Sequence, residues 1–351
     1  MKSMLDLNKA IDDLVGEFGS THDNDYVSQL IKTSLELGND RTSTLDMKIA
    51  SSALKEMREA FAMFQPYTQR SKVTIFGSAR TKKDDPLYLH TQHVAKKLAD
   101  QGWMVVTGAG PGIMEAGMEG AGREQSIGVS IRLPFESSAN SIIAGDDKYV
   151  SMRYFFTRKL MLVKESHAFL CLPGGFGTLD ETFELLTLTQ TGKGVPVPIV
   201  LLDLPGDRFW HAIDDLIRTQ LLTRNLVSPA DLALYRVCDS IDDATNEIND
   251  FYRNYHSIRF IGKHLIMRLK NEPSPQLVDD LNRNFAHILR SGLFEQATPH
   301  PAEKSDNDQL DKFRIRFDPE RSDAGGLRSL INFVNQHTIN QAASAHQSLS
   351  Q

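Results

Sequence analysis

The stretch LCLPGGFGTLDETFELLTLTQTGK, residues 170–193, joins an apolar run, a glycine-rich turn and a helix-forming segment without a break. Residues 168–172 are all apolar and predict a buried strand. The turn at 173–177 contains three glycines, Thr178 stands at the expected helix N-cap, and Glu181 follows three residues later. A strand that ends in glycines and opens a helix directs backbone N–H groups and the positive end of the helix dipole toward one point. The stretch therefore predicts an anion-binding turn in an α/β protein.

The composition is that of an ordinary globular protein, with 351 residues, 40% hydrophobic and 24% charged, which allows about two domains. The chain has no apolar run long enough to span a membrane, and charges interrupt the N-terminal segment where a signal peptide would need an apolar block. We therefore expect a cytoplasmic protein without a membrane partner. A net charge of −6 argues against nucleic acid as the partner.

The spacing of cysteine and histidine indicates neither a disulfide framework nor a metal site. Cys171 and Cys238 are the only cysteines, and the 11 histidines show no HxH or HExxH pattern. We expect no metal and no cofactor.

Residues 1–70 predict a helical extension. Its clearest segment, 45–64, carries an apolar stripe at three- or four-residue spacing that consists of Leu45, Ile49, Ala53, Met57, Phe61 and Phe64. Gln65 and Pro66 then end the helix. The extension packs on the main domain or a second subunit, or serves as a dedicated partner-binding arm.

Residues 71–255 alternate short apolar runs with helical segments, which predicts a doubly wound, Rossmann-like parallel sheet with ligands at the carboxyl ends of its strands. The expected strands are 72–76, 103–107, 127–131, 168–172, 198–203 and a short one near 233–237. Two of the expected helices start at Asp85 and near residue 112. The others cover about 150–165, 178–190, 208–222 and 242–255.

Residues 256–351 predict a small α/β appendage whose last residues, 340–351, are frayed. One or two strands over 257–270 precede a helix at 275–290, a polar linker, a strand at 312–317 and a helix at 326–335. The basic residues of this region either line a second anionic ligand site or form solvated strand faces or a dimer rim. They are Arg259, Lys263, Arg268, Lys270, Arg314 and Arg316.

Three glycine-bearing turns follow predicted strands, at 77–78, 108–112 and 174–177. Parallel strands end at one edge of the sheet, so these turns can converge on a phosphate. A dinucleotide fingerprint fails because Ile113 occupies the position of its third glycine, and the chain contains no GxxxxGK[ST] pattern for a P-loop. The candidate phosphate-binding residues are Ser78, Gly108, Gly110, Gly112, Gly174, Gly175, Gly177 and Thr178.

Charged residues near the third turn have two interpretations each. Glu181 either completes a capping box with Thr178 or faces a ribose or an attacking water. Arg158 and Lys159 lie on the preceding predicted helix, where they either form surface ion pairs or contact the ligand.

Three segments, TGAGPGIMEAG at 107–117, YFFTRKLMLVKES at 154–166 and LPGGFGTLDE at 172–181, closely resemble the Lonely Guy (LOG) family of nucleoside 5′-monophosphate phosphoribohydrolases. Its members have often been labelled lysine decarboxylases. The resemblance covers about residues 71–255 and implies a Rossmann-like fold and a homodimer. It also implies hydrolysis of the N-glycosidic bond of AMP or a cytokinin riboside 5′-monophosphate to free base and ribose 5-phosphate.

Position by position, the resemblance implies that Arg158 and Glu181 are catalytic. Lys159, next to Arg158 on the same predicted helix, is a further candidate for the substrate-binding set. The resemblance places the phosphate on the backbone of Gly110, Gly112, Gly174, Gly175, Gly177 and Thr178. Phe155, Phe156 and Thr157 replace the segment in which plant-type members carry a histidine, and Glu115 replaces a glycine, as in the bacterial branch. A sensor that binds a nucleotide without turnover is the alternative. Decarboxylation has no support, since no lysine stands in a recognisable pyridoxal-phosphate setting.

Overall fold

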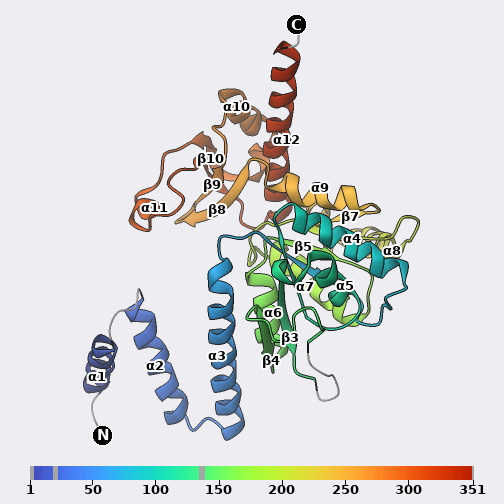
Figure 1. Cartoon of the computed structure of the whole chain (residues 1–351). Helices are drawn as coiled ribbons and strands as arrows, with labels where there is room; N and C mark the ends of the chain where they lie inside the picture. Colours follow the sequence, from blue (N-terminus) through green and yellow to red (C-terminus); the bar gives the residue numbers. More distant parts are fainter. Residues whose placement is uncertain (1–3, 19–22, 134–138, 350–351) are drawn as a thin grey trace. The chain divides into compact units, whose positions relative to one another are not determined.

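The computed structural model describes residues 4–18, 23–133 and 139–349, and the chain divides into two compact units, Met1–Phe61 and Ala62–Gln351. The first unit is helical (Figure 1): α1 (Met4–Glu17) packs against α2 (Asn24–Asn39), and α3 (Thr44–Phe64) follows. Helix α3 covers the stripe expected at 45–64, and the 3-10 turn Gln65–Tyr67 ends it at Pro66 as predicted.

The second unit contains a seven-stranded sheet of order β4-β3-β2-β1-β5-β6-β7, in which every neighbouring pair is parallel. The expected doubly wound sheet is confirmed. The strands are β1 (Lys72–Phe76), β2 (Met104–Thr107), β3 (Ser126–Ile131), β4 (Tyr149–Met152), β5 (Ala168–Cys171), β6 (Ile199–Leu202) and β7 (Arg236–Cys238). The strand order reverses direction between β1 and β5, and ligands bind at such a switch point in open α/β sheets.

Helices cover both faces of this sheet (Figure 1). They are α4 (Pro86–Asp100), α5 (Ile113–Ala121), α6 (Phe155–Lys164), α7 (Phe176–Gln190), α8 (Phe209–Leu216) and α9 (Ile241–Phe251). Helix α4 contacts both α5 and α9, and the core on that face includes Val73, Val94, Leu170 and Ile248. The chain crosses the sheet in the opposite direction after β4, so right-handed crossovers place α6, α7 and α8 on the other face. Asp85 caps α4 by accepting a hydrogen bond from the Leu87 N–H, as expected.

The helix expected over 150–165 is wrong, because the segment splits into strand β4 and helix α6. Val150 pairs with Val129 of β3, and burial alternates along β4 as on an edge strand with one covered face. The pairing with β3 overrides the helical spacing of the apolar residues, which continues only from Phe155. The sheet gains one parallel strand at its edge.

The C-terminal part of the second unit is a four-stranded antiparallel sheet of order β10-β11-β9-β8. Its elements are β8 (Tyr255–Ile261), β9 (His264–Leu269), α10 (Pro275–Asn284), β10 (Leu289–Gln296), α11 (Pro301–Ser305), β11 (Phe313–Pro319) and α12 (Ala324–Leu349). One face is apolar and packs on α10 and α12 through residues such as Met267, Leu281, Ile315 and Leu330.

Strand β10 was not expected, since the predicted helix ran to residue 290. Register shifts in its pairing with β11, together with a positive φ of 79° at Gly292, break the alternation that would have marked a strand. Helix α12 continues to Leu349, beyond the helix expected over 326–335, and residues 350–351 lie outside the described residues. Helix-forming residues such as Gln341, Ala342 and Ala343 continue beyond the apolar stripe on which the prediction relied.

The other face of this sheet carries the basic residues. Glu303 of α11 is fully buried and accepts hydrogen bonds from Arg268 and Arg314 at 2.7–3.3 Å. Asp306 and Asp308 pair with Arg259. The segment expected as a polar linker, 304–311, and Glu303 just before it therefore supply carboxylates that neutralise the arginines from within the chain.

Buried polar side chains fasten α12 to the rest of the unit. Asn335 accepts hydrogen bonds from the backbone N–H groups of Asn254 and Tyr255 at 2.8 and 2.9 Å and donates to the Phe251 carbonyl. Arg328, buried on the same helix, pairs with Glu247 of α9. Among the residues that the structure describes, no helix combines the length and apolar character needed to cross a membrane.

The turns that follow β1, β2 and β5 are in direct contact at the carboxyl edge of the sheet. Ser78 accepts a hydrogen bond from the Ile113 N–H at 3.0 Å and donates its own N–H to the Pro173 carbonyl at 3.3 Å. Gly112 has a φ of 68°, and a Cβ there would lie 2.4 Å from the Ser78 carbonyl oxygen. The expected convergence of the three turns is confirmed.

We predict that Gly112→Ala destabilises the protein by at least about 2 kcal/mol, because it combines a strained φ with a clash against backbone atoms that cannot rotate away. The matched control is Gly177→Ala on α7, where no described atom lies within 4 Å of an added Cβ. The control should be neutral or slightly stabilising. Denaturant unfolding of both variants measures the difference, and equal stabilities would contradict the close contact.

Candidate functional site

Two adjacent cavities lie at the carboxyl edge of the seven-stranded sheet. The first, of about 660 Å³, is called the α7 lobe and is lined by residues that include Ser78, Gly175, Thr178 and Glu181. The second, of about 710 Å³, is called the α5 lobe and lies against the Gly108–Gly110 turn and the ends of β3 and β4. Both lobes share the residues Ala79, Gly108, Met114, Phe155 and Arg158. The lobes therefore form one two-part site.

Helix α7 begins at Phe176, with Gly175 as its N-cap, so the expected N-cap at Thr178 is wrong. The glycines let the backbone enter the helix three residues earlier than the capping pattern suggested. The capping box between Thr178 and Glu181 is therefore not formed, and no side chain in the described part of the chain caps α7. The first residues of the helix line the α7 lobe, where Gly175 and Gly177 leave open space. This end of α7 suits an anion.

Glu181 is buried in the α7 lobe, with 7% of its surface exposed. Its Oε2 atom has no hydrogen-bond partner among the described residues. Burial raises the pKa of Glu181 to about 6, although the positive charges of Lys159 and Arg158 act in the opposite direction. A buried carboxylate that titrates near neutral pH is typical of a catalytic acid or base.

Arg158 of α6 is half-buried and lines both lobes. Its Nε donates to the Val129 carbonyl at 3.1 Å, and a Cβ on Gly108 would lie 2.1 Å from its Nη2 atom. Glycine at 108 therefore makes room for the guanidinium. The structure brings Arg158 and Glu181 into the same cavity, which the sequence could only imply by resemblance.

The other predicted site residues divide into two groups. Ser78, Gly108, Gly175, Gly177 and Thr178 line the α7 lobe, and Gly108 and Gly110 line the α5 lobe. Gly112, Gly174 and Lys159 are not among the described residues that line either lobe.

Gly112 and Gly174 contact the Ser78 backbone instead and hold the turns together. Lys159 pairs with Asp180 and Glu184 at 2.6 and 2.7 Å.

Residues at the ends of β3 and β4 were missed by the sequence reasoning. Ser130, Arg132, Tyr149 and Ser151 line the α5 lobe. The Ser130 and Tyr149 hydroxyls are 2.8 Å apart, and Arg132 donates to the Ser151 carbonyl at 3.1 Å. Their signal was hidden because β4 was assigned to a helix; an edge strand at 149–152 would have placed Tyr149 and Ser151 beside the site.

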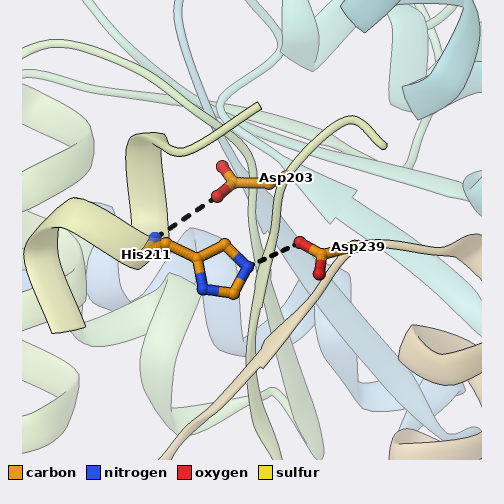
Figure 2. Close-up of side chains that lie close together, drawn as sticks. All are labelled: Asp203, His211 and Asp239. Atoms are coloured by element: carbon orange, nitrogen blue, oxygen red, sulfur yellow. Dashed lines mark hydrogen bonds and ion pairs between the residues drawn. The ribbon is translucent and has the colours of Figure 1, made fainter. Parts of the chain in front are cut away.

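A second group of ionisable residues lies after β6 and β7 (Figure 2): Asp203, His211 and Asp239 have ligand-type atoms within 4.8 Å of one another. Both carboxylate oxygens of Asp203 accept hydrogen bonds from the backbone N–H groups of Trp210 and His211 at the start of α8. His211 Nε2 lies 2.7 Å from Asp239 Oδ1 at the surface. These contacts account for the group as a helix cap beside a surface pair, and we assign it no catalytic role.

Comparison with known proteins agrees with this geometry. A family model described as "Possible lysine decarboxylase" matches residues 111–248. The chain is 38% identical over 74 residues to the probable cytokinin riboside 5′-monophosphate phosphoribohydrolase LOGL1 of Oryza sativa subsp. japonica, which covers 21% of this chain and 31% of the rice protein. The chain thus spans about a third of that relative's length.

Two further matches cover more of the chain. The cytokinin riboside 5′-monophosphate phosphoribohydrolase of Mycobacterium tuberculosis is 30% identical over 159 residues, 43% of this chain and 79% of the relative. The solved molybdenum cofactor carrier protein of Chlamydomonas reinhardtii is 20% identical, with a TM-score of 0.37, over 51% of this chain and 96% of that structure. The extent of the mycobacterial match and the motifs at the two lobes show that this chain belongs to the LOG family, as its sequence motifs suggested.

Proposed function

We propose that this protein hydrolyses the N-glycosidic bond of a nucleoside 5′-monophosphate, releasing the free base and ribose 5-phosphate. The observation that carries the proposal is the buried Glu181 carboxylate beside the N-terminus of α7; within the described ranges, one oxygen of Glu181 has no hydrogen-bond partner and no side chain caps α7. The names of the relatives support the same chemistry. Family resemblance also supports a homodimer, and we propose a cytoplasmic enzyme that acts on free nucleotides.

Electrostatics supports a site for the 5′-phosphate in the α7 lobe. The N–H groups at the start of α7 and the positive end of its dipole attract a dianion, and the Ser78 turn forms the facing wall. Glu181 lies one turn further along the helix, so a phosphate at the helix end puts the ribose next to the carboxylate.

Cleavage of the N-glycosidic bond builds positive charge on the ribose, which becomes oxocarbenium-like. An ionised Glu181 stabilises this charge and takes the proton of the water that attacks C1′. The electron pair of the broken C–N bond goes to the departing base. Arg158, which borders both lobes, offsets the negative charge on the base and keeps Glu181 ionised.

The base extends from the α7 lobe past Arg158 into the α5 lobe. That lobe is lined by polar side chains such as Ser130, Arg132 and Tyr149, and Phe155 lies at the junction of the lobes. Polar groups suit the edge of an unmodified purine better than an apolar substituent on it. We therefore propose AMP as the better substrate, ahead of a cytokinin riboside 5′-monophosphate.

Incubation of the protein with AMP and chromatography of the products test the activity directly. Free adenine in equal amount to ribose 5-phosphate is the expected result. AMP binding in calorimetry, without release of a base from any nucleoside monophosphate, would instead identify the protein as a nucleotide sensor.

Glu181→Gln should lower the turnover of AMP by about 10²- to 10⁴-fold, because the amide cannot take a proton or carry the compensating charge. AMP affinity should change little, since the phosphate contacts remain. The matched control is Asp180→Asn, the neighbouring carboxylate, whose side chain is 63% exposed and ion-paired with Lys159. Steady-state kinetics and calorimetry provide both values, and an equal loss in the two variants would contradict the role of Glu181.

Activity should fall on the acid side of a pKa of about 6, because only ionised Glu181 performs the chemistry. Below that pH, kcat/KM should decrease about tenfold per pH unit. The substrate phosphate also titrates near pH 6, so the pH dependence of the kinetics has to be compared with a second measurement, made without substrate. A flat profile between pH 5 and 8 would be incompatible with this assignment.

The substrate-free counterpart is the stability of Glu181→Gln. Burial raises the folded-state pKa of Glu181 above its unfolded value, so ionising it costs the folded state free energy at pH above 6 and nothing below about pH 4. At pH 8 the variant should be more stable than the wild type by roughly 2 kcal/mol, and the gain should disappear as the pH falls through 6 toward 4. Thermal or denaturant unfolding across this range measures the difference; a variant that is less stable at pH 8 would show that Glu181 is a structural residue.

A further inference from the structure

Lys159 lies close to the proposed catalytic carboxylate without lining either lobe. Its amine, on α6, is 2.6 Å from Asp180 and 2.7 Å from Glu184, and its side chain is 18% exposed. Asp180 directly precedes Glu181 on α7, and Glu184 follows it by three residues. The lysine therefore ties α6 to the short part of α7 that carries Glu181.

We propose that Lys159 is a positioning residue: it holds the Glu181 carboxylate ionised and fixed in the α7 lobe and does not bind the substrate phosphate. The inference rests on the proposed function, since it assigns how the same site keeps its base in the active form. It also replaces the substrate-binding role that the sequence suggested for this lysine.

The need for a cation follows from the charges around Glu181. Asp180, Glu181 and Glu184 lie within about one turn of α7, where like charges destabilise one another and favour protonation of the most buried group. The facing groups are Arg158 and Lys159 from α6 and the buried Cys171 thiol from β5. Lys159 contacts the two flanking carboxylates directly, and Arg158 lines both lobes. Lys159 is thus the cation placed to offset the acidic cluster.

The contacts of Lys159 also argue against a phosphate ligand. Burial alone would lower its pKa, but the hydrogen bonds to Asp180 and Glu184 raise the pKa above the usual range for lysine, so the amine stays charged. To reach a phosphate at the start of α7, the amine would have to leave both carboxylates. Two charge-assisted hydrogen bonds would be lost in exchange for one ligand contact.

The test compares Lys159→Met, Lys159→Arg and Glu184→Gln with the wild type. Lys159→Met removes the offsetting charge, and the acid limb of the kcat profile for AMP should move to higher pH by about one to two units. Lys159→Arg should restore the wild-type limb. Glu184→Gln removes a like charge and leaves Lys159 in place, so its limb should move to lower pH.

The same variants separate positioning from phosphate binding. At pH 9, where Glu181 is ionised in all of them, Lys159→Met should recover kcat to within a few fold, with an unchanged KM for AMP and an unchanged Kd for ribose 5-phosphate. A Kd for ribose 5-phosphate raised at every pH would overturn the proposal in favour of a direct phosphate contact. Limbs that do not move in Lys159→Met and Glu184→Gln would also overturn it.

A readout without turnover keeps this inference separate from the proposed function. The stability gain from Glu181→Gln at pH 8 should be larger in the Lys159→Met background and smaller in the Glu184→Gln background. If the wild type releases base but these gains are equal, the role of Lys159 is wrong and the enzymatic function stands. If the gains differ as expected while no nucleotide is cleaved, the positioning of Glu181 stands and the enzymatic function fails. If Lys159→Met does not fold, two other results decide the role of Lys159. They are the shift of the acid limb to lower pH in Glu184→Gln and the wild-type acid limb in Lys159→Arg.

Discussion

The contact between the turns after β1, β2 and β5 is the constraint on which the site depends. Ser78, at the end of the central strand, is hydrogen-bonded through its backbone to Ile113 on one side and Pro173 on the other. These two bonds fix the starts of α5 and α7 relative to each other. Residues 108 to 112 and 174 to 178 are remote in sequence, yet they form two walls of one cavity system because β1 lies between β2 and β5. Glycine is needed where the backbones meet, and Gly112 illustrates this most directly.

Two buried glutamates show how differently this fold treats a structural carboxylate and the carboxylate that we propose to be catalytic. Burial would raise the pKa of Glu303, but hydrogen bonds from Arg314, the His300 backbone and Arg268 lower it below the usual value. Glu181 is nearly as inaccessible, yet one of its oxygens lacks a partner among the described residues and its pKa is raised to about 6. Ionisation of the buried Glu181 therefore lowers the stability of the folded protein. A neutral or better-paired side chain at this position would restore it. Such a cost is expected at a functional site and has no structural benefit at this position.

The sequence predicted the features that depend on local patterns. Glycine turns after apolar runs predicted the parallel sheet and the convergence of its loops, and the motifs around Arg158 and Glu181 identified the family. The sequence did not predict the strands that depend on long-range pairing. Strand β4 forms because Val150 pairs with β3, and the irregular register of β10 hides the alternation typical of a strand. The Thr178 N-cap was wrong because the glycine turn starts the helix at Phe176. Side-chain partners were least predictable, since the ion pairs of Lys159 depend on how α6 packs beside α7.

The same dependence on packing explains why the two arginine-bearing regions differ in how their charges are paired. In the C-terminal sheet, Arg259, Arg268 and Arg314 share a face with carboxylates from the segment 303–308, and their charges are neutralised within the chain. At the two lobes, Lys159 pairs with the neighbouring acids Asp180 and Glu184, and Arg158 lines both cavities. The acidic side chains next to Glu181 on α7 therefore have a cationic partner of their own on α6. In the proposed function, this pairing keeps them from offsetting the positive end of the α7 dipole where the phosphate would bind.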